Sequence, residues 1–193
     1  MKKVWITLGV IAAVVLIFFL WAGGVYDKAV SLQEETNKSW SNVQTTYQRR
    51  ADLVPQLVAT VQAGAENEGK ILTAVTEARA GIVGAKTPED MELAGKKINA
   101  AINLAFEAYP QIRATENFGA LQSQLEGTEN RISEARQSYN TSIANYNKHI
   151  RGFFKKLAIS MTSDAEEFPI KKGFEAVTEG AEQAPDVKKM FDE

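Results

Sequence analysis

The chain has no cysteine and only one histidine among its 193 residues. Without cysteine it can form no disulfide, no thiolate zinc site and no cysteine nucleophile. A single histidine, His149, excludes a metal site built from several imidazoles. Lysine and arginine number 22 and aspartate and glutamate 24, so the net charge of −2 gives no basis for binding nucleic acid. We therefore expect no metal, no cofactor and no nucleic-acid partner.

Strand patterns are missing as well, because no alternating run of β-branched residues is bounded by turn residues. Apolar residues recur instead at intervals of three or four, which is typical of helices that bury one face. The predicted fold is all-α, with an N-terminal transmembrane helix that continues into an antiparallel bundle of about four long helices. We divide the chain into an anchor (1–25), a helical bundle (26–160) and an acidic tail (161–193).

The clearest feature is an uncharged apolar stretch over residues 4–26. About twenty such residues suffice for a helix to cross the roughly 30 Å of hydrocarbon in a bilayer. Trp5 lies at one end and Trp21 and Tyr26 at the other, where aromatic side chains favour the headgroup level. A cleaved signal peptide is the alternative, but its apolar core is normally shorter, and "LWAGG" is a poor cleavage site. We predict an uncleaved anchor in contact with membrane lipid.

The orientation follows from the flanking charges. Lys2 and Lys3 precede the apolar stretch, whereas Asp27 and Lys28 follow it and nearly cancel. Because positive flanks stay in the cytoplasm, the N-terminus is expected there and the C-terminal domain outside it.

The stretch "RRADLVPQLV", from Arg49 to Val58, predicts a corner between two helices. Asp52 is placed to cap a new helix, and Pro55 would then occupy a position whose missing N–H breaks no helical bond. The alternative is one long helix kinked at Pro55. The helix expected before this corner has a core-facing stripe of apolar and small polar residues: Leu32, Thr36, Ser39, Trp40, Val43 and Tyr47.

Later boundaries have clearer signatures. Thr87 and Pro88 predict a helix start, and the tyrosine–proline pair at 109–110 predicts its end. The stripe of this helix is Leu93, Ile98, Ala101, Ile102, Ala105 and Phe106. The longest pattern begins near Thr115 and has as its apolar side Phe118, Leu121, Leu125, Ile132, Tyr139, Ile143, Tyr146, Ile150 and Phe153. Beyond residue 160 the periodicity weakens, and we expect a tail with partial disorder or one short helix at 174–182.

A row of polar residues follows one face of the long helix at intervals of seven, four and seven: Glu129, Arg136, Asn140 and Asn147. Because Ile132 and Ile143 share this face, the row predicts a buried polar network that fixes helix register. We expect a structural role for the full cluster, and a ligand-binding site is the alternative. The cluster comprises Arg49, Arg50, Asp52, Arg79, Glu129, Asn130, Arg136, Tyr139, Asn140 and Asn147.

Three further features could have a catalytic or binding role, and for each a structural role is favoured. His149 has no recognisable partner, so an exposed or interfacial position is expected rather than a catalytic base. The stretch "HIRGFFKKL", residues 149–157, could contact anionic lipid or a partner helix, but ordinary bundle surface with a buried Phe153 is the favoured interpretation. The G-x-x-x-x-G-K match at residues 64–70 is followed by Ile71 instead of Ser or Thr and has no preceding strand, so it predicts no nucleotide site.

Several uncommon words occur in order: "RRADLVPQLV", "VTEAR" (75–79), "YPQIRATENFGALQSQLEGTENRISEAR" (109–136) and "YNTSIANYN" (139–147). Together with the anchor, they resemble the LemA family over roughly residues 26–153. The resemblance implies a membrane-anchored bundle of long helices in the bacterial envelope, with no established enzymatic activity, cofactor or catalytic residue. Phe154 departs from the proline usual in the family, so the last helix and the tail transfer least well.

We therefore expect a non-enzymatic scaffold or adaptor of the bacterial inner membrane that assembles with copies of itself. The resemblance also suggests an envelope protein partner such as a membrane protease. The alternative is a module that binds a ligand, peptide or lipid through the arginine cluster.

Overall fold

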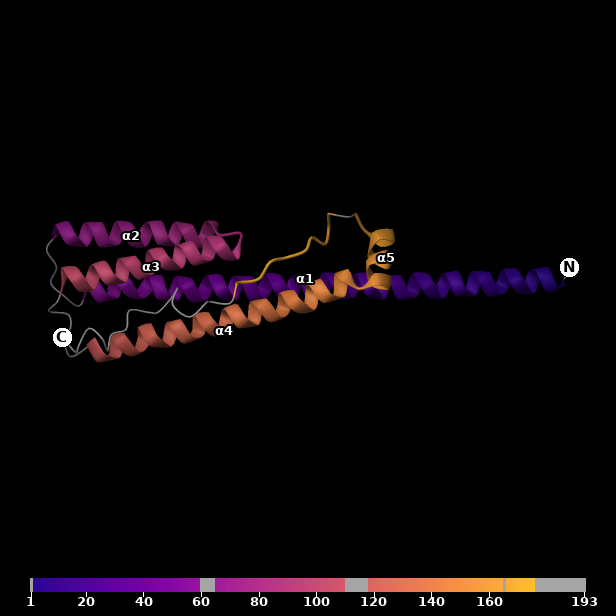
Figure 1. The fold of residues 1–193 in the computed structure, drawn as a ribbon, viewed down its shortest axis with the longest axis horizontal. Coiled ribbons are helices and arrows are strands. Elements are labelled where there is room, and N and C mark those ends of the chain that lie inside the picture. The colour runs from indigo at the N-terminus through magenta and orange to yellow at the C-terminus, as the bar shows by residue number, and fades with distance from the viewer. Residues whose placement is uncertain (1, 60–64, 110–117, 165, 176–193) are drawn as a thin grey trace. The chain divides into compact units, whose positions relative to one another are not determined.

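The structure, a computed structural model, describes residues 2–59, 65–109, 118–164 and 166–175. Its helices are α1 (Lys2–Ala59), α2 (Ala65–Gly84), α3 (Pro88–Ala108), α4 (Phe118–Arg151) and α5 (Phe153–Thr162), shown in Figure 1. Within these ranges there is no strand, which confirms the predicted all-α class.

The chain divides into two compact units. Unit 1 consists of Met1–Ser39 and Thr141–Lys171, and unit 2 of Trp40–Asn140 and Lys172–Glu193. Helices α1 and α4 therefore contribute residues to both units, whereas α2 and α3 belong to unit 2 and α5 to unit 1.

The predicted corner at Arg49–Asp52 is wrong, because α1 continues through Pro55 to Ala59. A proline inside a helix costs about 3 kcal/mol, since it removes one hydrogen bond and crowds the preceding turn. That cost is offset here by burial, which stabilises a helix by about 1.5–3 kcal/mol for each large apolar side chain. The buried side chains around the proline are Leu53, Val54, Leu57 and Val58. The alternative of a single long helix is therefore the one that the chain adopts.

Both predicted boundaries of α3 are confirmed. Thr87 is the N-cap, and its side chain accepts from the backbone N–H of Asp90 while the Asp90 side chain accepts from the N–H of Thr87. Hydrogen bonding from the Thr87 side chain, then from the backbone of Lys86 and Thr87, holds the pKa of Asp90 below its usual value. The helix ends at its C-cap, Tyr109, directly before the proline.

Helices α2 and α3 lie side by side in unit 2 (Figure 1). A Cβ built on Gly81 of α2 would meet the Cβ of Ala94 at 3.4 Å. Leu93, expected to face the core, is 58% exposed, and Met91 is fully buried instead. The buried side chains of this unit include Val43, Tyr47, Val54, Leu57, Ile71, Val75, Ile82, Met91 and Ile98.

Gly95 of α3 is the tightest point of this core. A Cβ there would lie 2.7 Å from Cε1 of Tyr47, whose side chain is buried. Because this ring cannot move without disturbing its neighbours, we expect Gly95→Ala to lower the free energy of unfolding by about 1–3 kcal/mol. Thermal unfolding followed by circular dichroism measures the change. The matched control is Gly127→Ala in α4, where nothing lies within 4 Å and the gain in helix propensity should raise the Tm. An unchanged Tm for Gly95→Ala would contradict this packing.

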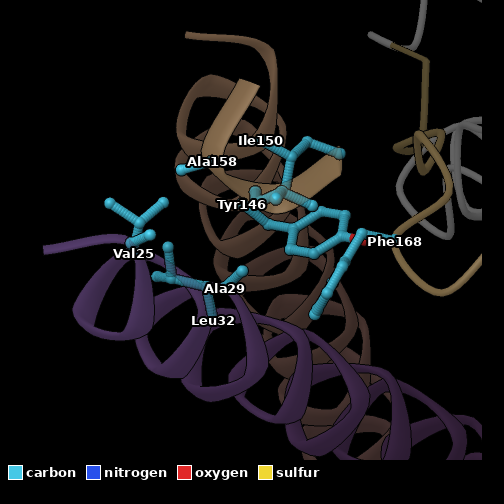
Figure 2. Packing of buried hydrophobic residues seen from close by; sticks show 9 residues of the cluster. Val25, Ala29, Leu32, Tyr146, Ile150, Ala158 and Phe168 are labelled. Atoms are coloured by element: carbon cyan, nitrogen blue, oxygen red, sulfur yellow. The ribbon is translucent and has the colours of Figure 1, made fainter. Parts of the chain in front are cut away.

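Unit 1 has its own core, which joins α1, α4, α5 and the segment after α5 (Figure 2). Its buried members are Ala22, Val25, Ala29, Leu32, Tyr146, Ile150, Ala158, Ile159 and Phe168. Phe18, Tyr26 and Val30 pack against them and are partly buried.

Of the two positions expected for His149, exposed or interfacial, the structure shows the interfacial one. His149 is buried, 8% exposed, and its Nε2 lies 3.0 Å from the carbonyl oxygen of Val25, so it joins α4 to α1 within unit 1. The expectation for Phe153 is wrong. Phe153 is not buried but 80% exposed. The reason is Gly152, whose extended backbone (φ −61°, ψ 131°) ends α4 and starts α5 in a new direction. Ala158 and Ile159 consequently face the core in place of Phe153.

Among the described residues, α1 is the one helix long and apolar enough to cross a membrane. None of its most apolar 18-residue window is buried against protein. The side chains from Val4 to Ile17 are all exposed.

Candidate functional site

Arg50 is the most deeply buried charged group of the candidate cluster, at 5% exposed. It forms an ion pair with Glu129 of α4, the expected contact with the long helix. Its Nε also donates to Oδ1 of Asn99 on α3, at 3.2 Å, and one terminal nitrogen donates to the carbonyl oxygen of Leu125 at 3.4 Å. Arg50 thus links three helices within unit 2.

Unit 2 contains two other ion pairs, and neither shares a residue with the pair of Arg50 and Glu129. Arg79 of α2 donates to Asp52 of α1 at 2.5 Å, and Asp52 also accepts from the Gln48 side chain. Arg136 of α4 donates to Glu92 of α3 at 2.5 Å. The polar row therefore does not form one network supplied by α1 and α2. Glu92 was missed because nothing in the sequence separates it from the other acidic residues on α3.

The C-terminal part of the row holds an extended segment of the chain. Asn140 donates from Nδ2 to the carbonyl oxygen of Phe174 at 2.9 Å and accepts from its N–H at 2.8 Å. The Phe174 ring packs against Trp40 and Tyr139, with centroids 6.0 and 5.7 Å away, and the Arg136 guanidinium lies 4.7 Å from its centroid. Burial, and secondarily the charge of Glu89, raises the pKa of Tyr139. Phe174 and Glu175 are not helical, and the rest of the short helix expected at 174–182 lies outside the described residues.

Asn147 makes the same kind of contact within unit 1. Its Nδ2 donates to the carbonyl oxygen of Lys171 at 2.8 Å, and its Oδ1 accepts from the Lys171 N–H at 3.1 Å. The ammonium of Lys171 donates to Asn37 and lies 5.4 Å from the Tyr146 ring. Burial lowers the pKa of Lys171, which Glu34 partly opposes, and burial raises the pKa of Tyr146 to about 12. Asn140 and Asn147 therefore bind main chain, in two separate units.

Arg49 and Asn130 are exposed. Arg49 borders an open groove of about 550 Å³ between α1 and α4 in unit 2, in which Arg131 supplies a second cation. The groove is lined by Arg49, Asp52, Leu53, Gln56, Ser123, Gln124, Gly127, Thr128 and Arg131. Sequence reasoning missed its α4 side, because neither Arg131 nor the small residues around it departs from an ordinary solvent-facing pattern.

Most of the predicted cluster is thus occupied by contacts within the protein, and the groove is its open part. In the described ranges no group of three histidine, aspartate or glutamate side chains is placed to hold a metal ion. No curated protein matches the chain. The model of the LemA family matches residues 39–188, which is most of the chain and includes the whole polar cluster. The chain therefore belongs to the LemA family.

Proposed function

We propose that this protein is a single-pass membrane-anchored scaffold or adaptor of the bacterial envelope, with its helical units outside the cytoplasm, and that it assembles with copies of itself. The observation that carries the proposal is the difference in burial between the first and the later part of α1. Its first part exposes large apolar side chains, such as Trp5 at 75% and Leu20 at 71%, that no described residue covers. Its later part supplies buried residues to the cores of both units.

The partners of the polar residues support the same interpretation. Arg50, Arg79 and Arg136 each pair with an acidic side chain of a neighbouring helix, and Asn140 and Asn147 are occupied by backbone. Groups satisfied in this way fix helix register and hold segments together. They are therefore suited to a rigid support rather than to turnover of a substrate.

The groove beside Arg49 favours a second candidate, a module that binds an anionic ligand or peptide. Two arginines at the rim and Leu53 in the lining combine charge with apolar surface. This candidate predicts that charge reversal at Arg49 and Arg131 abolishes the biological phenotype while self-assembly is unchanged.

The test is a membrane-impermeant, amine-reactive cross-linker applied to spheroplasts of the source cells, followed by purification and mass spectrometry. Lys38 of α1 and Lys97 of α3 are exposed, so both should react without lysis. A cross-link between Lys97 of one copy and Lys97 of another would identify self-assembly, and a stoichiometric second protein would identify an adaptor. Lys3, before the apolar stretch, is the internal control and should react only after permeabilisation.

Modification of Lys38 and Lys97 only after lysis would overturn the orientation. Singly modified lysines without any intermolecular cross-link would overturn the scaffold itself.

A further inference from the structure

Helix α5 has two apolar faces, and the residues that the structure describes cover only one of them. Ala158 and Ile159 are buried in the core of unit 1. On the other side the exposed fractions are 80% for Phe153, 68% for Phe154, 50% for Leu157 and 59% for Met161. At 3.6 residues per turn these four side chains fall within an arc of about 100°.

The part of α1 that α5 packs against indicates what contacts the exposed face of α5. Ala158 lies in one cluster with Val25 (Figure 2). Ile159 and Ala22 belong to the same cluster, and Phe18 packs against it. Residues 18–25 are the end of the uncharged stretch, and Asp27 and Lys28 follow directly. In a helix that crosses a bilayer, this is where hydrocarbon gives way to headgroups. The exposed face of α5 therefore lies beside the boundary of the membrane that α1 enters.

The charges around α5 fit the same location. Arg151, Lys155 and Lys156 are exposed at and beside the start of the helix, where long basic side chains can reach phosphate groups. A cavity of about 430 Å³ combines Arg151 and Lys156 with apolar residues that include Ile159 and Phe168. Acidic groups are also present: Asp164 lines the cavity, and Glu167 accepts a hydrogen bond from Tyr26 at 2.6 Å.

We propose that α5 is a membrane-interface helix, whose exposed apolar face inserts at the headgroup–acyl boundary of the bilayer crossed by α1. This inference rests on the proposed membrane anchoring and adds a second contact with the same membrane. The occupant of the face is lipid rather than a second copy or another protein. The reasons are its continuity with the apolar stretch of α1 and its basic border.

The absence of cysteine allows a direct test in full-length protein. Single-cysteine variants Leu157→Cys, Leu16→Cys and Lys38→Cys are labelled with an environment-sensitive fluorophore. Each is reconstituted at one copy per nanodisc of phosphatidylcholine and phosphatidylglycerol. Iodide then quenches labels in water, and brominated lipid quenches labels in the bilayer. We expect the Leu157 label to be several-fold less sensitive to iodide than the Lys38 label, and quenched by brominated lipid.

The Leu16 label separates the two proposals. A lipid-quenched Leu16 label beside an iodide-quenched Leu157 label would overturn the interface helix and leave the anchor intact. Iodide quenching of both would overturn the anchoring itself. A Leu157 label shielded from iodide and from brominated lipid alike would mean that protein covers the face, which also overturns the proposal. Because each disc holds one copy, a second chain cannot mimic lipid protection.

Discussion

Replacing Arg50 with methionine is expected to lower the free energy of unfolding by about 2–4 kcal/mol. Arg50 is buried, and its removal leaves Glu129 without its ion-pair partner and Asn99 without a donor. Breaking a fully buried pair costs about 3–5 kcal/mol, and the Glu129 side chain, at 36% exposed, recovers part of this from water. The measurement is thermal unfolding of the full-length protein in mild detergent.

The neighbouring arginine provides the matched control. Arg49 is exposed at the rim of the groove, so Arg49→Met should change the stability by no more than about 0.5 kcal/mol. The double variant Arg50→Met with Glu129→Met should recover most of the loss, because no unpaired charge remains between the helices. A loss of stability as large for Arg49 as for Arg50 would contradict the structural role assigned to the buried ion pair.

Removing the aromatic ring of Phe174 should cost about 3–5 kcal/mol, the usual loss when a buried aromatic side chain is truncated to alanine. Phe174 is only 5% exposed, stacks on Trp40 and lies under the Arg136 guanidinium. Because it also fixes the extended segment to α4, Phe174→Ala should make the nearby chain susceptible to protease. Limited proteolysis with mass spectrometry of the released fragment measures this directly.

Two further variants separate the ring from the backbone contact. Gly173→Ala keeps the ring, but its Cβ would lie 2.6 Å from Oδ1 of Asn140, which accepts the Phe174 N–H. It should therefore also release the segment, whereas Glu175→Ala, at an exposed position, should not. Equal protease resistance of Phe174→Ala and Glu175→Ala would show that the segment is held by other contacts.

The elements that sequence predicted correctly have local causes. The start of α3 depends on Thr87, Pro88 and Asp90, which lie within four residues, and its end depends on one proline. The continuation of α1 through Pro55 could not be predicted in this way. Local chemistry favoured a break there, and the apolar side chains that stabilise the continuous helix are buried by residues distant in sequence.

For the candidate site too, the sequence predicted what depends on local spacing and not what depends on distant residues. Spacing on α4 correctly placed Glu129 and Asn140 toward the protein, because helical periodicity decides which face is buried. It could not give partners, since the acceptor of Arg136 lies 44 residues away and that of Asn140 is a backbone carbonyl. The break at Gly152 ends α4 before Phe153, so Phe153 is exposed and α5 is a separate helix.

The hydrogen bond between His149 and Val25 spans 124 positions in the sequence, which has a consequence for biosynthesis. A ribosome adds about 5–20 residues per second, so the α1 side of unit 1 is made roughly 6–25 s before His149. During that interval Ala22, Val25, Ala29 and Leu32 have none of their α4 or α5 neighbours. The α2–α3 pair, whose contacts are close in sequence, can form while this interval lasts. The α2–α3 contact can therefore form before the core of unit 1, which also needs residues of α4 and α5.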